Sequence, residues 1–299
     1  MSVHPEIIIS KDDWDMILEA MFRIAPENTD KLQQITAGWQ FSFEVEHTKV
    51  ARANFAAFPD LKEVRASQAA LCGLWLLAAC SFKIMELGMV ASRALGKDDP
   101  AIADVSLELD EWGFTPRINH ARALFSRDLP WPDNVEKPNI SNKISDATDP
   151  TTNVFLAACS WVLLHEIGHV ALSHTTAIPK HEQTQQEYDA DKFALSWIID
   201  DCVDKEKRTF RLIGVAVATA WLLLKDAQCD SRGGIHPPSF RRLQELFLPL
   251  DLADNDPFYE CSGYFLKALF LPTQLMDEAP SAKALFDEVA ERLKDEFET

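Results

Sequence analysis

The sequence predicts a mostly helical α+β fold, with a small sheet near the N-terminus and a helical C-terminal half. Residues 39–47 and 103–112 alternate apolar and polar side chains, as half-buried strands do. From residue 150 onward, apolar residues instead recur at the three- and four-residue spacing of a helix face. With 47% hydrophobic and 25% charged residues over 299 positions, the chain has the composition of a protein that buries a core.

The first half is predicted to combine helices with these two strands. From Lys11 to about Ile24, apolar side chains have helical spacing, with Asp and Lys on the opposite face. The apolar segment from Ser67 to about Leu95 lies between the two predicted strands and is expected to be helical. Residues 129–150 are rich in Pro, Asn, Asp and Ser, which is typical of a loop.

The second half is predicted to contain helices and no strand. The helical patterns lie at residues 151–174, 183–203, 208–227, 237–248 and 280–297, with a further apolar segment at 257–270. We place a soft boundary near residue 146, within one cooperative protein. It divides the chain into an α/β part, residues 1–145, and a helical part, residues 146–299.

The net charge of −18 disfavours two classes of partner. Nucleic-acid binders need a basic surface that neutralises phosphates. Anionic membrane surfaces likewise attract basic proteins. We therefore expect neither a nucleic-acid nor a membrane partner.

The sequence has the features expected of a cytoplasmic protein. The N-terminal MSVHPEIIISKDDWD lacks the basic start, apolar stretch and cleavage site of a signal peptide. The apolar segments 69–82 and 212–224 are shorter than the roughly 18 to 20 residues that span a bilayer, so we interpret them as core helices. The six cysteines form no C-x-x-C pair, which indicates free buried thiols in a reducing compartment.

A metal-binding motif lies in a strongly apolar predicted helix. Asp149 is a good N-cap and Pro150 suits the first helical position, so the helix is expected to begin there. It contains H-E-x-x-H, and because positions i and i+4 share a helix face, His165 and His169 can bind one cation. Glu166 cannot share that direction, but it can reach a neighbouring water as a general base.

Chance is the alternative explanation of this motif. The surrounding residues argue against it, because Val162, Leu163, Leu164 and Val170 are apolar. Two histidines and a glutamate are costly to bury in such surroundings without a partner. A bound divalent cation supplies that partner, and we predict Zn²⁺ because tetrahedral zinc accepts histidine nitrogens.

The next predicted helix offers a third ligand. Glu187 and Asp191 share a face with Ala194 and Ile198, and this otherwise apolar face should pack inward. Catalytic zinc sites have three protein ligands and one open position, so we expect Glu187 to complete a His-His-Glu site. Asp191 is expected to accept the second N–H of a zinc-bound imidazole and fix its tautomer.

Other interpretations of these residues stay open. Glu187, Asp189 and Asp191 could form a solvated acidic patch. His174 and His181 are rival ligands. His174 could instead interact with the dipole at the helix end, and His181 lies in the connecting turn, where a surface residue is expected.

A fourth element follows a Gly-Gly pair that permits a tight turn. His236 precedes Pro237 and Pro238, which begin the next predicted helix, so its side chain could project into a cleft. A hydrolase needs a donor that stabilises the oxyanion of its tetrahedral intermediate. His236, with Arg242 nearby, is our candidate for this catalytic role. The alternative is a turn histidine before a proline-capped helix.

The order of these motifs resembles the gluzincin metallopeptidases of the HtpX and CAAX-prenyl protease type. The matching residues are H-E-x-x-H (165–169), E-x-x-x-D (187–191) and H-P-P-x-x-x-R (236–242). The resemblance implies a zincin-like fold in which Glu187 is the third zinc ligand, Asp191 supports a ligand and His236 lies in the active site. Those peptidases are membrane proteins, unlike this chain. It is more similar to the Lit family of soluble phage-exclusion proteases, over its C-terminal half.

The resemblance implies a zinc endopeptidase that acts in abortive infection by cleaving a protein substrate, translation factor Tu. It also implies activation by a protein or peptide partner, and residues 1–145 are where we expect substrate or partner contacts. Two other functions remain open. One is a non-catalytic regulatory or binding protein on this scaffold, against which the intact Glu166 argues. The other is a small-molecule amidohydrolase, which a deep closed pocket would favour over a long groove beside an edge strand.

Overall fold

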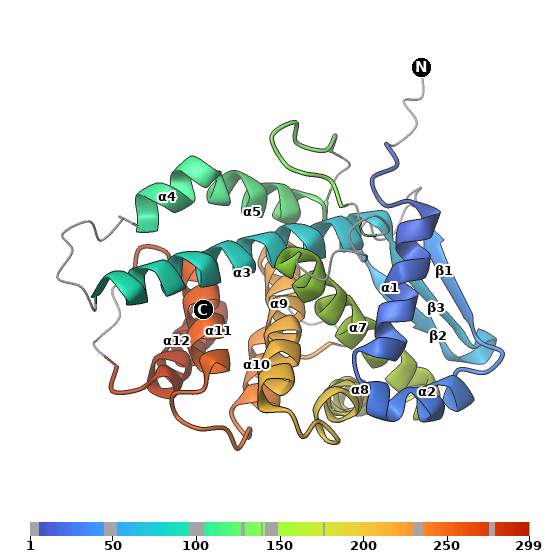
Figure 1. The fold of residues 1–299 in the computed structure, drawn as a ribbon. Coiled ribbons are helices and arrows are strands. Elements are labelled where there is room, and N and C mark those ends of the chain that lie inside the picture. Colours follow the sequence, from blue (N-terminus) through green and yellow to red (C-terminus); the bar gives the residue numbers. More distant parts are fainter. Residues whose placement is uncertain are drawn as a thin grey trace.

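The computed structural model describes residues 6–44, 53–95, 105–126, 129–138, 140, 149–175, 177–229, 236–274 and 279–298. Helices make up most of the described chain, and a small sheet lies at one end of the molecule (Figure 1). The predicted class, a mostly helical α+β fold, is confirmed.

The N-terminal helix α1 (Lys11–Arg23) confirms the first predicted helix. It begins with a capping box, in which Asp13 N donates to Ser10 Oγ and Ser10 N donates to the Asp13 carboxylate. Its apolar stripe buries Trp14 and Ile17. A 3₁₀ turn (Pro26–Asn28) and the short helix α2 (Thr29–Ile35) then lead into the sheet.

Three short strands form the sheet in the order β1-β3-β2. β1 (Gln40–Glu44) pairs in parallel with β3 (Glu63–Ser67), and β2 (Phe55–Phe58) pairs antiparallel with β3. β1 confirms the strand predicted at 39–47, of which residues 45–47 lie outside the described residues. β2 and β3, joined through the 3₁₀ turn Pro59–Leu61, are additional to the prediction. This order places β2 at an edge of the sheet.

The prediction of a strand at residues 103–112 is wrong. The described part of this segment is the helix α4 (Val105–Trp112), which is followed by α5 (Phe114–Ala123). Leu107 is 56% exposed, whereas Leu109 and Trp112 pack against the core. Leu109 and Trp112 are three residues apart and lie on the buried face of the helix, so the apolar-polar alternation in the sequence does not reflect a strand.

The apolar segment 67–95 forms the long helix α3 (Gln68–Leu95), as predicted. Figure 1 shows α4 and α5 lying along its outer side.

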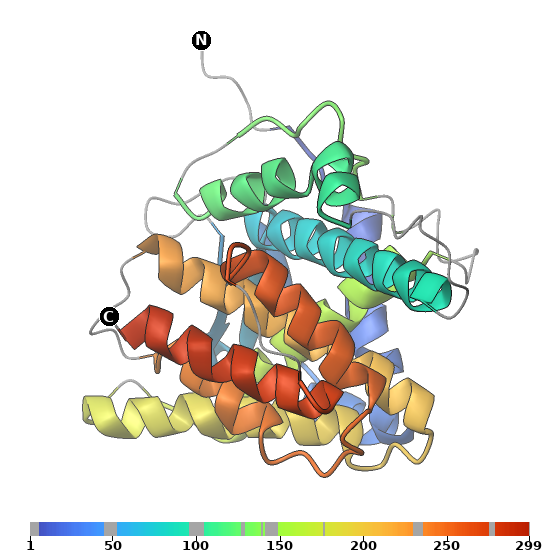
Figure 2. The same cartoon turned by 90° about the vertical axis from the view of Figure 1, so that its left-hand side faces the viewer.

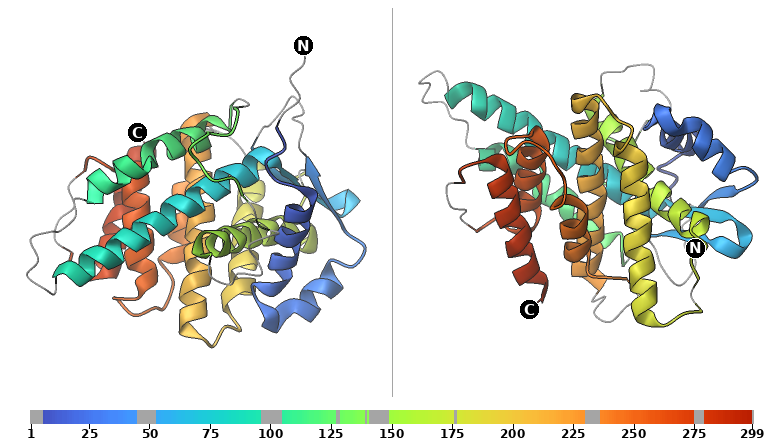
Figure 3. Two further views of the ribbon diagram at one scale, coloured as in Figure 1. Left: turned by 45° about the horizontal axis from the view of Figure 1, so that its top comes forward. Right: turned by 90° about the horizontal axis from the view of Figure 1, so that it is seen from below.

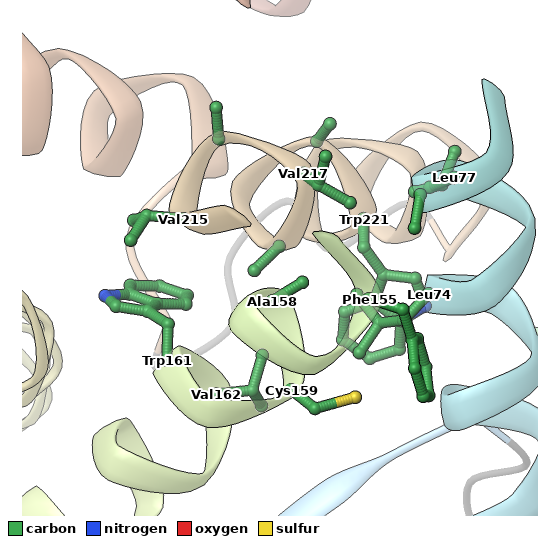
Figure 4. Packing of buried hydrophobic residues seen from close by; sticks show 14 of the residues in the cluster. Leu74, Leu77, Phe155, Ala158, Cys159, Trp161, Val162, Val215, Val217 and Trp221 are labelled. Atoms are coloured by element: carbon green, nitrogen blue, oxygen red, sulfur yellow. The ribbon is translucent and has the colours of Figure 1, made fainter. Parts of the chain in front are cut away.

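Helix α7 (Pro150–Ala171) occupies the centre of the molecule. It begins as predicted, with Pro150 in the first turn and the Asp149 side chain accepting the backbone N–H groups of Thr151 and Thr152. It packs against α1 and α3 from the first half, and against α8 (Lys180–Ile199) and α9 (Lys205–Cys229) from the second. Figure 4 shows Trp221 of α9 reaching toward Phe155 of α7 and Leu74 of α3.

Three further helices complete the described chain: α10 (Ser239–Phe247), α11 (Pro257–Phe270) and α12 (Ala282–Glu298). Figures 2 and 3 show α11 and α12 lying side by side, at the end of the molecule away from the sheet. The described residues from α7 onward contain helices and no strand, as predicted. Buried side chains of both halves join one hydrophobic cluster. The division at residues 145 and 146 stays a prediction.

Among the described residues, two helices are long and apolar enough to cross a membrane by length and composition alone. They are the segments Gln68–Met89 and Pro150–Ala171, and 72% of the apolar stretch of each is buried inside the protein. Core helices of soluble proteins show the same combination of length and burial. Cys72, Cys80 and Cys159 are free and buried, as predicted, whereas Cys202 and Cys261 are free but only half-buried.

Candidate metal centre

The last turns of α7 place both motif histidines on one face. His165 and His169 are one turn apart, and their Nε2 atoms lie 3.1 Å from each other. Their rings are nearly perpendicular, with centroids 4.8 Å apart. Both imidazoles therefore aim Nε2 at the same point beside the helix.

Helix α8 brings Glu187 to this point. Glu187 Oε2 lies 3.6 Å from His165 Nε2, and Glu187 Oε1 lies 3.5 Å from His169 Nε2. The close crossing of α7 and α8 depends on Gly168, because a Cβ there would lie 3.1 Å from the Phe193 ring and 3.3 Å from Ala190 Cα. The potential ligand atoms of the three residues all lie within 4.8 Å of one another.

This group fits a metal ion by two criteria. Two imidazole nitrogens and one carboxylate form the donor set of many catalytic zinc sites. In addition, Glu187 Oε2 is buried without a hydrogen-bond partner among the described residues. Burying such an oxygen is costly unless another group compensates its charge, and a cation between the three side chains does so.

Asp191 and Arg242 support His165 from behind. The Asp191 carboxylate lies 2.9 Å from His165 Nδ1, and Arg242 donates to both Asp191 oxygens, at 2.7 and 2.6 Å. Asp191 is 1% and Arg242 4% exposed, so the pair is fully desolvated. The contact to Nδ1 leaves Nε2 of His165 as the nitrogen that faces the candidate metal position.

Arg242 also lines the groove beside the candidate ligands, and two of its three guanidinium nitrogens, Nε and Nη2, are held by Asp191. The third, Nη1, lies 3.8 Å from Glu187 Oε2, and the expected catalytic role of Arg242 stays a prediction. The sequence places Arg242 six residues after His236, in the first turn of α10, but it does not reveal that Asp191 is its partner.

His236 lies at the rim of the site, close to Glu187. Its side chain is 58% exposed, and its Nδ1 lies 3.0 Å from Glu187 Oε2, without hydrogen-bond geometry. It stands just before α10, as the Pro-Pro pair predicts. The Gly-Gly turn that precedes it lies outside the described residues.

Glu166 borders the same cleft but is not part of the three-residue group. Burial raises the pKa of its carboxyl above the ordinary glutamate value, and the neighbouring His165 opposes that rise. A carboxyl whose pKa is raised toward neutrality is a better proton acceptor, which suits a general base.

The two rival histidines occupy different places. His174 lies against the outer edge of His169, with 2.9 Å between the two Nδ1 atoms. His181 is 82% exposed at the start of α8 and lies outside the three-residue group, as expected for a surface residue.

The surrounding charges affect the two motif histidines differently. Burial disfavours protonated His165, but the carboxylates of Asp191 and Glu187 outweigh it and raise its pKa to about 9. Burial and the nearby His165 lower the pKa of His169 to about 3. Burial also opposes ionised Glu187, yet His165 and His236 hold its pKa well below the usual range. Glu187 and His169 are thus already in the protonation states that bind a metal, whereas His165 must release a proton.

A groove of about 670 Å³ runs past the three-residue group. Its floor is the face of α7 that carries Val162, His165 and His169. One wall comes from the edge strand β2, and the others come from α8, α9 and the segment around His236. The described candidate ligands and Glu166 thus line one solvent-accessible groove.

Comparison with known proteins identifies the class as peptidase. Residues 64–262 match the family Peptidase U49, and the chain belongs to this family. Among curated proteins, it is similar to the cell death peptidase of Escherichia coli (strain K12), with 29% identity over 119 residues. That similarity covers 38% of each chain, so it spans well under half of the relative's length. No solved structure matches this chain. These findings confirm the resemblance to Lit-type proteases.

Proposed function

We propose that this peptidase is a zinc-dependent endopeptidase that hydrolyses a peptide bond in a protein substrate. One observation carries the proposal: potential ligand atoms of His165, His169 and Glu187 converge within 4.8 Å, and the buried Glu187 Oε2 accepts no hydrogen bond from the described residues. Zinc is the metal proposed because this donor set is the one that catalytic zinc sites use.

The chemistry divides between the metal and the side chains around it. Zinc at this position supplies Lewis acidity, which polarises a peptide carbonyl and lowers the pKa of a neighbouring water. Glu166 takes the proton of the attacking water and passes it to the leaving amine. Because Glu166 borders the groove outside the ligand group, it is free for this proton transfer.

His236 is the proposed donor to the developing oxyanion. It lines the groove near Glu187, on the exposed side of the site. A ring N–H on the exposed side of the site can donate to a substrate oxygen in the groove. We assign Arg242 a positioning function, because its Nε and Nη2 donate to Asp191, whose carboxylate contacts His165.

The shape of the groove supports a protein substrate over a small amide. Asn54, Ala56 and Ala57, in and next to the edge strand β2, form one wall. An edge strand presents backbone N–H and C=O groups with which an extended peptide can pair.

The finer expectations rest on the resemblance alone. We propose that the substrate is a translation factor, cleaved during abortive infection after a protein or peptide partner activates the enzyme. The name of the relative, cell death peptidase, supports a role of this kind. A cytoplasmic location, with neither nucleic-acid nor membrane partners, belongs to the same proposal.

Expression of the wild type and of Glu166→Gln in otherwise identical cells tests this function. Both proteins should fold and hold about one zinc per chain, whereas new protein N-termini should arise with the wild type alone. Glu182→Gln, at an exposed glutamate of α8, is the matched control and should behave as the wild type. A zinc-loaded Glu166→Gln protein that still produces the new termini or the cellular effect would favour the non-catalytic regulator.

A further inference from the structure

Helix α7 ends in a turn that folds the chain back onto the candidate metal centre. Ser173 adopts a left-handed conformation, with φ of 57°. Ser173 N donates to Val170 O at 3.1 Å, and His174 N donates to His169 O at 2.9 Å. These two hydrogen bonds form a Schellman motif, in which glycine is usual at the left-handed position. A serine here accepts backbone strain, which is often found beside functional sites.

The turn brings the imidazole of His174 against that of His169. The ring centroids are 5.0 Å apart, at an interplanar angle of 74°, and the two Nδ1 atoms are 2.9 Å apart. One of these nitrogens donates and the other accepts, so one ring carries its proton on Nδ1. The opposite nitrogen of His169, Nε2, faces Glu187 and His165.

His174 is therefore not placed as a metal ligand. Its close contact is with the outer edge of His169, and it lies outside the group whose ligand atoms converge. The arrangement matches the one at the other motif histidine, where the Asp191 carboxylate lies 2.9 Å from His165 Nδ1. Each of the two motif histidines thus has a close partner at Nδ1 and presents Nε2 to the centre.

We propose that His174 positions His169 for metal binding by accepting a hydrogen bond from its Nδ1–H. This contact fixes the tautomer and the orientation of the His169 ring, so that Nε2 is the binding nitrogen. Partners of this kind typically change metal affinity by about 10- to 100-fold. The proposal rests on the zinc centre proposed above, but it concerns a residue that the motif does not contain.

The test is the zinc dissociation constant of the full-length chain, measured by competition with a chelator. His174→Ala should bind zinc about 10- to 100-fold more weakly than the wild type. His174→Asn should recover most of the loss, because the asparagine side chain places an acceptor near the position of Nδ1. His181→Ala, at an exposed histidine, is the matched control and should bind as the wild type does.

A second measurement separates positioning from a structural function. The metal-free His174→Ala and wild-type proteins should unfold at the same temperature, because His174 is only half-buried at a helix end. The absorption spectrum of the cobalt-substituted His174→Ala protein should differ from that of the wild type. Ser173→Gly, which keeps the turn and relieves its strain, should retain full zinc affinity.

Equal zinc affinity of His174→Ala and the wild type would overturn the proposal. So would an asparagine variant that binds as weakly as the alanine variant, because hydrogen-bond acceptance would then not be the cause. Failure of the zinc centre itself looks different, because the wild type would then bind no zinc, whereas failure of this proposal alone leaves the wild type zinc-bound.

Discussion

At the scale of single residues, a line of contacts runs from Arg242 through Asp191 to His165. The Arg242–Asp191 pair is fully desolvated and bidentate, and Asp191 also meets His165 Nδ1. Removing one member of a buried ion pair leaves the other charge uncompensated, which costs far more than the pair itself contributes. We therefore expect Arg242 to stabilise the site through its ion pair with Asp191.

Arg242→Met should lower the free energy of unfolding of the metal-free protein by about 3–5 kcal/mol. The double variant with Asp191→Asn should be less destabilised than the sum of the two single variants, since no uncompensated carboxylate remains. Urea unfolding of the three variants and the wild type measures this. Strict additivity of the two effects would show that the pair is not coupled in the folded protein.

Residue spacing on helices predicted which of the candidate ligands the structure brings together. His165 with His169, and Glu187 with Asp191, are each four residues apart, and the i, i+4 geometry of a helix puts each pair on one face. The structure brings both faces together around one point. The placement of Arg242 and His174 could not be predicted in this way. Arg242 meets a partner on another helix, and His174 depends on a left-handed turn at Ser173.

At the scale of elements, the position of the metal-site helix depends on its close packing against α9. A Cβ on Gly214 would lie 2.4 Å from Ala157 Cβ and 3.0 Å from the Ala157 carbonyl carbon, so the two helices approach backbone to backbone. By contrast, the nearest atom to a Cβ on Gly263 of α11 would be 3.6 Å away. The same substitution at these two glycines should therefore have opposite effects.

Gly214→Ala should destabilise the protein by about 1–3 kcal/mol, because the helices must move apart. Gly263→Ala should be neutral or stabilising by up to about 1 kcal/mol, because alanine favours the helix and meets only ordinary contacts. Thermal unfolding of the two variants provides the comparison. If Gly214→Ala were as stable as Gly263→Ala, α7 and α9 would not be in the close contact described.

Long elements could be predicted from the sequence, whereas most short ones could not. The helices from α7 onward each extend over several turns, so their apolar period is visible in the sequence. β2 and β3 span only Phe55–Phe58 and Glu63–Ser67, which is too short for alternation to stand out. In the helix α4, Val105, Leu107 and Leu109 alternate by coincidence, while Leu109 and Trp112 face the core.

At the scale of the whole molecule, a buried arginine connects the two halves of the chain. Arg211 of α9 donates to the Glu27 carboxylate and to Ile198 O, the latter at 2.7 Å. Glu27 belongs to the turn between α1 and α2, so this contact joins the N-terminal elements to the end of α8. The Arg211 hydrogen bond holds the pKa of Glu27 below its ordinary value, against the smaller opposing effect of burial.

This depressed pKa predicts a pH-dependent contribution to stability. The folded state favours ionised Glu27, so the contribution is complete above the unfolded pKa of about 4.3 and is lost as pH falls through the lower folded pKa. Glu27→Gln should therefore be less stable than the wild type at neutral pH, and the difference should shrink below about pH 4.3. Urea unfolding across this range measures it.

The matched control is Glu19→Gln, which removes an exposed pair with Arg23 on α1. Exposed pairs contribute about 0–1 kcal/mol, so this variant should follow the wild type at every pH. A difference between Glu27→Gln and the wild type that stays constant down to acid pH would contradict the assigned ion pair.

The central claim is that His165, His169 and Glu187 hold a zinc ion, and a crystal of the purified protein measured across the zinc absorption edge tests it most directly. We predict one anomalous peak per chain, about 2.0–2.2 Å from an Nε2 atom of each histidine and from a Glu187 oxygen. A chain without such a peak, or a peak bound by His174 or His236 in place of Glu187, would contradict the account.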